Sequence, residues 1–300
     1  MIHHVNSNIN YTPRTYLNQW FKDDIVLITD NDYFYPETIQ LLDKWPIHQR
    51  VTDLTHNAMP DQSVTIPSRL ILSADYTNWY TPKTNFVFFP LFFWAFSCRD
   101  MLWFDSVSES KFDATANKTK TIMCLNSNPR PQRIWLYEEF KKLEVIDQMV
   151  YTWVGERTLP NDDFGVYRIG VNHPVYSECA VNLVTETEMT TCSLSEKSCK
   201  PFVALQIPII VGPPGCNKFL QDIGFDMFLD LVPWDTWDTE QSHEVKLKKI
   251  SQFVKQWILK GTILIDYYRV LPRVEYNKQY FHSESLRNCI MYQMTEITTT

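Results

Sequence analysis

Acidic and basic side chains lie on both sides of an apolar run in the second half of the sequence. Glu186 and Glu188 follow a predicted strand, Ser195-Glu196-Lys197 opens a predicted helix, and Gly212-Pro213-Pro214-Gly215 follows the apolar strand 207–211. A carboxylate can bind the diol of a ribose, whereas a lysine and a helix N-terminus can hold a diphosphate. This pattern therefore favours a nucleotide sugar as the ligand.

These elements, in this order, resemble the donor-binding signature of the α1,3-fucosyltransferase-like glycosyltransferases. Glu186 stands ten residues before the Glu196 of Ser195-Glu196-Lys197, and a proline-bearing strand, Ile207-Pro208-Ile209-Ile210-Val211-Gly212, follows. The family has Asn-Ser where this chain has Thr187-Glu188, and threonine where it has Ser195. The likeness covers about residues 120–230 and implies the two-domain GT-B fold.

Upstream, Asn126-Ser127-Asn128 with Arg130 and Arg133 is similar to the element that opens the family's donor domain. The resemblance implies that Glu196 accepts hydrogen bonds from the ribose hydroxyls, while Lys197 and one of the two arginines neutralise the departing diphosphate. A capping-region carboxylate and a solvated lysine are the structural alternative for Glu196 and Lys197. The predicted donor site comprises Asn126, Arg130, Arg133, Glu188, Ser195, Glu196, Lys197, Gly212 and Gly215.

Three features around this motif allow more than one interpretation. The glycines at 212 and 215 would let the backbone approach a phosphate, although a plain strand-to-helix turn explains them equally well. Glu188 and Glu196 have the Glu-x7-Glu spacing that many retaining GT-B enzymes show, so the stereochemistry stays open. Cys192 and Cys199 flank the motif, and we interpret them as small buried apolar residues instead of metal ligands or a nucleophile.

Transfer with inversion needs a carboxylate that takes the proton of the acceptor hydroxyl. The candidate catalytic residues are Asp30, Asp32, Asp75 and Glu186. Asp30-Asn31-Asp32 also resembles the Asp-x-Asp metal site of the other large transferase fold, but its place near the N-terminus favours a turn with capping aspartates. The sequence therefore predicts a metal-independent enzyme with no cofactor beyond the nucleotide-sugar co-substrate.

Apolar runs that alternate with amphipathic segments position these residues. Strands are predicted at 25–29, 68–75, 85–96, 121–125, 148–154, 180–185 and 207–211, and helices at the segment after Pro131, at 240–260 and at 276–294. The helix after Pro131 is expected to bury Ile134, Tyr137, Phe140 and Leu143; the helix 240–260 is expected to bury Leu247, Ile250, Val254, Trp257 and Ile258, with Gly261 as its C-terminal cap. Strands alternating with helices predict an α/β protein with parallel, doubly wound sheets.

The polar stretch 106–120 indicates a connector between two halves. We expect an acceptor-side α/β domain at 1–118, a donor-binding Rossmann-like domain at 119–265 and a helical tail at 266–300. Two Rossmann-like domains would then face each other across a cleft, because such sheets bind ligands at the carboxyl ends of their strands.

Composition narrows the class of protein. The chain has 300 residues, 44% apolar content and a net charge of −7, which argues against a generally basic nucleic-acid-binding surface. Its seven cysteines include no Cys-x-x-Cys pair, its N-terminus has no apolar signal segment, and its most apolar run, 86–96, is too short to span a membrane. These features predict a cytoplasmic protein without a membrane span, of bacterial or viral origin.

The sequence thus predicts a glycosyltransferase that moves a sugar from a nucleoside diphosphate to a hydroxyl of a glycan, a protein or modified DNA. Two alternatives stay open. A phage enzyme that glycosylates a hydroxylated DNA base predicts a basic strip leading to the site and salt-sensitive duplex binding. A non-catalytic nucleotide or glycan binding module predicts that the donor binds and that transfer never occurs.

Overall fold

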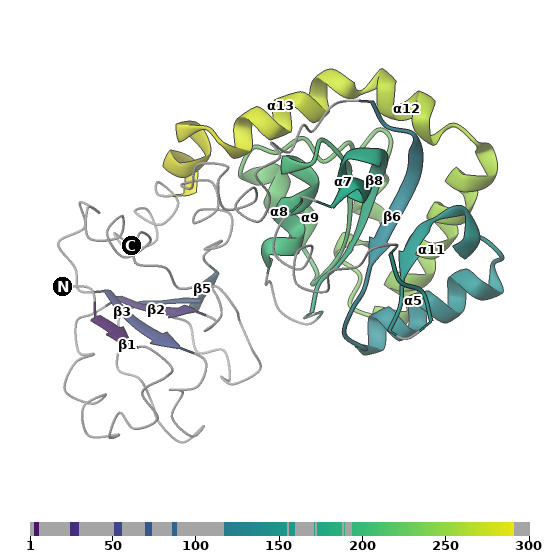
Figure 1. Cartoon of the computed structure of the whole chain (residues 1–300). Coiled ribbons are helices and arrows are strands. Elements are labelled where there is room, and N and C mark those ends of the chain that lie inside the picture. The colour runs from purple at the N-terminus through teal and green to yellow at the C-terminus, as the bar shows by residue number, and fades with distance from the viewer. Residues whose placement is uncertain are drawn as a thin grey trace. The chain divides into compact units, whose positions relative to one another are not determined.

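The computed structural model describes residues 117–290, apart from 155, 160–170, 172, 188, 190–193 and the side chain of Glu196, together with the backbone of five strands before residue 89. The chain divides into two compact units (Figure 1), one formed by Met1–Ala95 with Asn288–Thr300 and the other by Phe96–Arg287. The predicted boundaries at 118 and 265, and the cleft between two domains, stay predictions.

Five parallel strands form the sheet of the first unit. They are β1 (His3–Val5), β2 (Ile25–Thr29), β3 (Val51–Thr55), β4 (Leu70–Ser73) and β5 (Phe86–Phe88), in the spatial order β1-β3-β2-β4-β5. The strand predicted at 25–29 is confirmed as β2, and the shorter strands β4 and β5 lie within the segments predicted at 68–75 and 85–96. Continuous aliphatic runs such as Ile25-Val26-Leu27-Ile28 are typical of parallel strands that are covered on both faces.

Four parallel strands form the sheet of the second unit. They are β6 (Lys120–Leu125), β7 (Val150–Thr152), β8 (Cys179–Thr185) and β9 (Ile207–Val211), in the order β7-β6-β8-β9. All four correspond to predicted strands, and every residue of β8 and β9 is buried. The prediction of an α/β protein with parallel sheets is therefore confirmed.

The two sheets share a strand order. Without β1, the strands of the first sheet follow the spatial order 2-1-3-4 in chain sequence, and the strands of the second sheet follow the same order. In such sheets the order reverses between the first and third strands, here between β2 and β4 and between β6 and β8. Ligands bind outside the carboxyl ends of the strands at this switch point.

Helices cover both faces of the second sheet (Figure 1). The chain moves from β6 to β7 in one direction and from β8 to β9 in the other, so right-handed crossovers place α5 (Pro131–Lys142) and α8 (Glu196–Val203) on opposite faces. The helix α11 (His243–Lys260) packs against α5, and α13 (Leu271–Phe281) packs against α8. The described residues also form α7 (Pro174–Glu178), α9 (Cys216–Asp222), α10 (Asp235–Asp238), α12 (Ile263–Arg269) and the 3-10 turn η3 (Ile146–Gln148).

The predicted buried face of α5 is wrong in part. Tyr137 and Phe140 are buried as expected, but Ile134 is 44% exposed. Leu143 is only half-buried and lies beyond the helix end. Instead, the polar residues Gln132 and Arg133 are buried, because the first turn of α5 lies at the carboxyl edge of the sheet and their side chains donate to carbonyl groups there.

The long helix predicted at 240–260 is confirmed as α11. Its five predicted core residues, Leu247, Ile250, Val254, Trp257 and Ile258, are all buried. Gly261 follows the helix with a φ of 68°, the left-handed conformation that ends many helices. The tail predicted as one helix at 276–294 is wrong in its bounds, since α13 ends at Phe281 and a new helical stretch begins after Ser283, whose hydroxyl accepts from the Leu286 amide at 3.2 Å.

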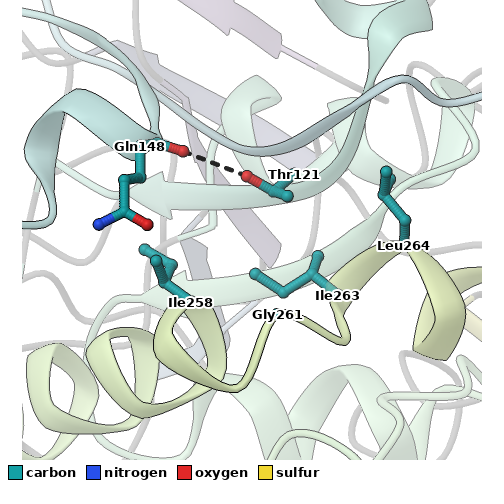
Figure 2. A pocket seen from close by; sticks show the side chains of 6 residues that line it. All are labelled: Thr121, Gln148, Ile258, Gly261, Ile263 and Leu264. Atoms are coloured by element: carbon teal, nitrogen blue, oxygen red, sulfur yellow. Dashed lines mark hydrogen bonds between the residues drawn. The ribbon is translucent and has the colours of Figure 1, made fainter.

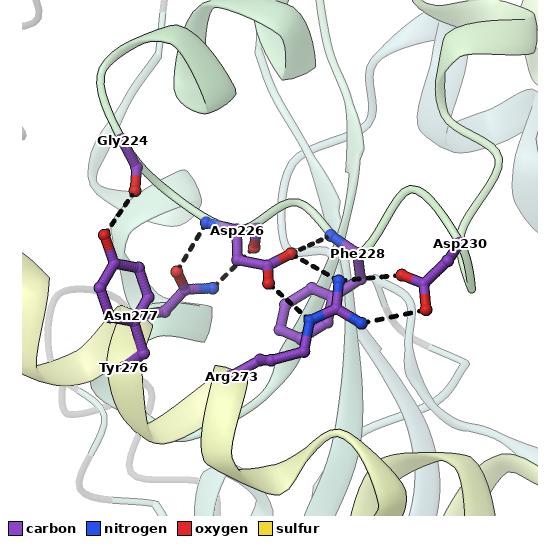
Figure 3. Close-up of polar contacts among 7 residues, drawn as sticks. All are labelled: Gly224, Asp226, Phe228, Asp230, Arg273, Tyr276 and Asn277. Carbon is purple, nitrogen blue, oxygen red and sulfur yellow. Dashed lines mark hydrogen bonds and ion pairs between the residues drawn. The ribbon is translucent and has the colours of Figure 1, made fainter.

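A partly exposed ion-pair cluster joins α13 to the segment that follows α9 (Figure 3). The Arg273 guanidinium donates to Asp226 Oδ2 at 2.5 Å and pairs with Asp230 at 2.8 Å, while it lies 4.9 Å from the centre of the Phe228 ring. The hydrogen bond to Asp226 raises the pKa of Arg273, and the hydrogen bond to Arg273 lowers the pKa of Asp230. Because the guanidinium is already paired with two carboxylates, it is not a candidate for binding an anionic ligand.

Four of the cysteines lie in the core of the second unit. Cys124, Cys179, Cys199 and Cys216 are buried, so the interpretation of Cys199 as a small buried residue is confirmed, whereas Cys192 lies outside the described residues. Within the described ranges, no helix combines the length and the apolarity that a membrane crossing needs.

Candidate functional site

Asn126 ties together the carboxyl ends of three strands at the β6–β8 switch point. Its side-chain Oδ1 accepts a hydrogen bond from the Thr185 hydroxyl at 2.5 Å, and its Nδ2 donates to Tyr151 Oη at 3.1 Å. Its backbone N–H donates to Thr152 Oγ1 at 2.8 Å. The residue is 3% exposed. A buried amide with these partners fixes the geometry of the edge on which the other candidate residues lie.

The two candidate arginines have different environments. Arg133 is buried, and its guanidinium donates to Thr185 Oγ1 at 3.1 Å, to the Thr185 carbonyl at 2.9 Å and to the Asn128 carbonyl at 3.1 Å. Arg130 precedes the first residue of α5 and is exposed, and within the described ranges its guanidinium has no hydrogen-bond or ion-pair partner. Arg130 is therefore the arginine whose charge faces outward at this edge.

Glu186 directly follows β8, and its hydrogen bonds connect the end of that strand to β9, α8 and α5. Its Oε1 accepts the Ser195 amide at 3.0 Å and the Ser198 hydroxyl at 2.5 Å, while its Oε2 accepts the Ser195 hydroxyl at 2.6 Å. Its own amide donates to Val211 O at 2.9 Å, and its carbonyl accepts Gln132 Nε2 at 2.7 Å. With 1% of its surface exposed, Glu186 locks the start of α8 to the ends of β8 and β9.

Lys197 lies in the first turn of α8. The helix is capped by Ser195, whose hydroxyl accepts the Lys197 amide at 3.3 Å and the Lys197 ammonium at 3.2 Å. This confirms the predicted helix start. It also places a half-buried cation beside the Glu186 carboxylate and its contacts with Ser195 and Ser198, which we call the carboxylate clamp. Glu196 is the first residue of this helix, but its side chain, like all of Glu188, lies outside the described residues.

The turn Gly212–Gly215 leads into α9, and the first amides of this helix are occupied. Asp238 Oδ1 accepts the Asn217 amide at 3.1 Å, and its Oδ2 accepts the Lys218 amide at 2.9 Å. An internal carboxylate thus occupies the position that a phosphate takes at a helix N-terminus. The roles of Gly212 and Gly215 in donor binding stay predictions.

Close packing accounts for Gly212. A Cβ at this position would lie 3.1 Å from Cys216 Sγ and 3.5 Å from Glu186 Cγ, so a side chain here would press on the carboxylate clamp. The Gly212 carbonyl accepts a hydrogen bond from the Lys246 ammonium at 3.0 Å, and the Asp238 carbonyl accepts a second one from the same ammonium at 3.2 Å. Lys246 is 1% exposed, and burial lowers its pKa.

A pocket of about 420 Å³ opens at the carboxyl edge of the sheet, and among the described donor-site candidates Arg130 alone lines it. It lies between the start of α5, the residues after β8 and the start of α11, and it is lined by Arg130, Pro131, Gln132, Trp135, Thr187, Met189, His243, Glu244 and Leu247. Its volume is within the range of small-molecule sites, and an apolar wall with a few charged groups is typical of them.

Sequence reasoning did not find Trp135, His243 or Glu244. The signal was nonetheless present, because His243 and Glu244 begin the predicted helix 240–260 and that helix had to run antiparallel to the strands. Its N-terminus consequently lies at the edge where parallel strands end. The sequence does not show that α11 packs against α5 and so covers the same face of the sheet.

The acceptor-side candidates Asp30, Asp32 and Asp75 lie outside the described residues. In the chain, Asp30 directly follows Thr29, the last residue of β2, and Asp75 stands two residues after the end of β4. Both positions follow the strands at the switch point of the first sheet. Their catalytic roles stay predictions.

No protein-family model matches this chain, and no curated protein sequence matches it. A crystal structure of an α1,3-fucosyltransferase aligns over 97% of this chain and 94% of its own, with a TM-score of 0.44 and 12% identity. An α1,3-fucosyltransferase structure with GDP-fucose aligns over 93% of this chain and 91% of its own, with the same TM-score and identity. Similarity at this level carries no argument about function, which has to come from the site itself.

Proposed function

We propose that the protein is a glycosyltransferase that transfers a sugar from a nucleoside diphosphate to a hydroxyl acceptor. The observation that carries the proposal is the pocket of about 420 Å³ at the β6–β8 edge, with the exposed guanidinium of Arg130 on its wall. A parallel sheet offers its ligand site at this switch point, and a guanidinium binds phosphate oxygens in a bidentate manner. The GT-B resemblance of the same segment agrees with this reading.

The reaction needs charge compensation on the leaving group. As the bond between the sugar C1 and the diphosphate oxygen breaks, the diphosphate keeps the electron pair and its negative charge grows. We assign Arg130 and Lys197 to that charge and Glu196 to the ribose hydroxyls. Two protein cations at the phosphates can replace a divalent ion, which supports the proposal of a metal-independent reaction.

The acceptor hydroxyl forms the new bond to C1 and gives its proton to a base. We propose that Glu186 is not this base, because its carboxylate is buried and already accepts three hydrogen bonds from Ser195 and Ser198. Glu186 is instead proposed as a positioning residue that holds α8 and with it Lys197. This leaves Asp30, Asp32 and Asp75 as the candidate bases.

Donor binding tests the proposal most directly. The protein is titrated with a panel of nucleoside diphosphates and nucleotide sugars, and binding is followed by thermal shift and calorimetry. We expect one nucleoside to bind, Arg130→Ala and Lys197→Ala each to weaken it about tenfold or more, and a chelator to leave it unchanged. Lys142→Ala is the matched control, since Lys142 is an exposed cation at the far end of α5.

Release of the nucleoside diphosphate in the presence of candidate acceptors then separates the alternatives. Transfer to a glycan or protein supports the proposal, whereas transfer to hydroxylated DNA with salt-sensitive duplex binding supports the phage enzyme. Binding without transfer or hydrolysis identifies a binding module. If Arg130→Ala binds every nucleotide as the wild type does, the assigned site is wrong.

A further inference from the structure

The end of α11 and the start of α12 meet at a turn of the second unit (Figure 1). Two apolar side chains are exposed there, Leu259 at 66% and Ile265 at 68%, the two highest values among the large apolar side chains of the described residues. They stand on either side of the turn at Gly261. We call residues 255–269 the α11–α12 corner.

This corner is also basic in an acidic protein. The corner contains two lysines and one arginine against one aspartate, so its formal charge is +2 in a chain whose total is −7. Lys260 is exposed beside Leu259, and Lys255 lies one turn earlier. A positive surface of this kind attracts an anionic partner.

The one acidic residue of the corner does not cancel this charge at the surface. Asp266 is 6% exposed, and its Oδ2 accepts the Trp257 indole N–H at 2.9 Å and the Thr262 hydroxyl at 2.7 Å. Its Oδ1 pairs with Arg269 at 3.0 Å. On the neighbouring η3, Asp147 is paired with Arg157 at 2.8 Å. The lysines of the corner are therefore the charges that a partner meets.

An apolar hollow of about 270 Å³ lies under the same turn (Figure 2). It is lined by Thr121, Gln148, Ile258, Gly261, Ile263 and Leu264. Thr121 stands near the start of β6, so the hollow lies at the amino ends of the strands. The candidate donor site lies at the carboxyl ends, and a partner seated on the corner leaves that site open.

We propose that the α11–α12 corner docks on an anionic phospholipid membrane surface. Lys255 and Lys260 would contact the lipid phosphates, while Leu259 and Ile265 enter the boundary between headgroups and acyl chains. Reversible membrane binding needs such a pairing of apolar insertion with basic charge. The exposed aliphatic pair favours lipid over nucleic acid, because phosphate neutralisation along a duplex gives no site that buries two aliphatic side chains. The proposal does not depend on the glycosyltransferase assignment.

Vesicle flotation of the full chain tests this surface. Vesicles of phosphatidylcholine with about 30% phosphatidylserine should carry the protein at about 0.1 M salt, and vesicles of phosphatidylcholine alone should not. Leu259→Ser with Ile265→Ser, and separately Lys255→Glu with Lys260→Glu, should each lower the fraction bound about tenfold or more. Leu259, Lys260 and Ile265 are exposed and Lys255 is half-buried, and circular dichroism checks that the variants are folded.

Matched substitutions on α5 provide the control. Ile134→Ser with Lys142→Glu changes one 44% exposed aliphatic residue and one exposed lysine outside the corner, and it should leave flotation unchanged. The proposal is overturned if the wild type fails to float with anionic vesicles. It is also overturned if the aliphatic variants float as the wild type does, or if duplex DNA binds at the same lysines and competes with the vesicles completely.

Discussion

The connections after β8 and after β9 have the same plan, a buried strand followed by a polar turn and a helix, yet they differ in where the carboxylate stands. After β9, Asp238 accepts the amides of Asn217 and Lys218 in the first turn of α9. After β8, Glu186 holds the capping residue Ser195 and the Ser198 hydroxyl of α8. One carboxylate occupies a helix N-terminus, and the other supports it from the side.

This difference separates a structural turn from a candidate binding turn. A helix N-terminus attracts anions because its first amides lack partners, and Asp238 satisfies that demand from within the protein. At α8, the carboxylate fixes the capping residue and leaves Lys197 in the first turn beside it. The same chemical motif thus closes one connection and leaves the other as the candidate donor-binding turn.

Asp238→Ala should have the largest effect on stability. It leaves the buried Asn217 amide and the Lys218 amide without their carboxylate acceptor and removes a negative charge that favours the buried ammonium of Lys246. We expect the free energy of unfolding to fall by about 3 to 4 kcal/mol, measured by urea denaturation. Nucleotide binding should persist where the variant is folded. A loss of binding without a loss of stability contradicts the closed turn.

Glu186→Gln should affect stability less but binding more. The amide cannot accept all three hydrogen bonds from Ser195 and Ser198, so we expect a loss of about 2 to 3 kcal/mol in the free energy of unfolding. Because the start of α8 is displaced, nucleotide affinity should fall about tenfold or more, with Lys197 still present. Asp238→Asn is the matched control, a carboxylate-to-amide change on the other connection. Equal affinity in the two variants would remove the distinction between the turns.

The strands that the sequence predicted are those with long aliphatic runs. Ile207–Val211 and Ile25–Thr29 matched the observed strands in both bounds, since a parallel strand buried on both faces leaves an uninterrupted apolar run. β1 and β3 were not predicted, because His-His-Val and Val-Thr-Asp-Leu-Thr carry polar residues and become strands only through pairing with each other and with β2. Such tertiary pairing outweighs local propensity.

The candidate site was predictable where its residues are close in the chain. Glu186, Ser195 and Lys197 lie together at the β8–α8 connection, as their spacing indicated. Asp238 and Lys246 could not be found in this way, because they reach the turn after β9 from α10 and α11, more than twenty residues further along. The sequence also did not distinguish Arg130 from Arg133. The two positions are three residues apart at the start of α5, so the Arg133 side chain is buried against the sheet while the Arg130 side chain is exposed.

The far end of α8 offers a pH-dependent test of the same helix. Lys118 is 2% exposed. Its ammonium donates to the Tyr176 carbonyl at 2.9 Å and to the carbonyl of Ala204, the C-cap residue of α8, at 2.8 Å. Burial lowers the pKa of Lys118 to about 7. The unfolded chain keeps a lysine pKa of about 10.4, so between these values it binds more protons than the folded protein does.

Stability from this group should therefore rise as the pH increases above 7 and be lost as the pH falls back to about 7. Between pH 7 and pH 9 we expect a gain of about 1 to 2 kcal/mol in the free energy of unfolding for the wild type relative to Lys118→Met. Urea denaturation of both proteins across this range measures the difference. A difference that does not change with pH would mean that Lys118 keeps its ordinary pKa, and that its hydrogen bonds to the two carbonyl groups compensate for its burial.

Gly215→Ala should have the smallest effect, and it tests the closed turn without touching a charge. Gly215 has a φ of 83°, which a side chain disfavours, but a Cβ there would meet no atom within 4 Å. Backbone strain alone should then cost about 1 kcal/mol in the free energy of unfolding. If Asp238 closes this turn to phosphate, nucleotide affinity should stay within about twofold of the wild type. A tenfold loss of affinity with so small a loss of stability would show that the backbone at Gly215 contacts the ligand. The turn after β9 would then have to be counted with the turn after β8 as part of the donor site.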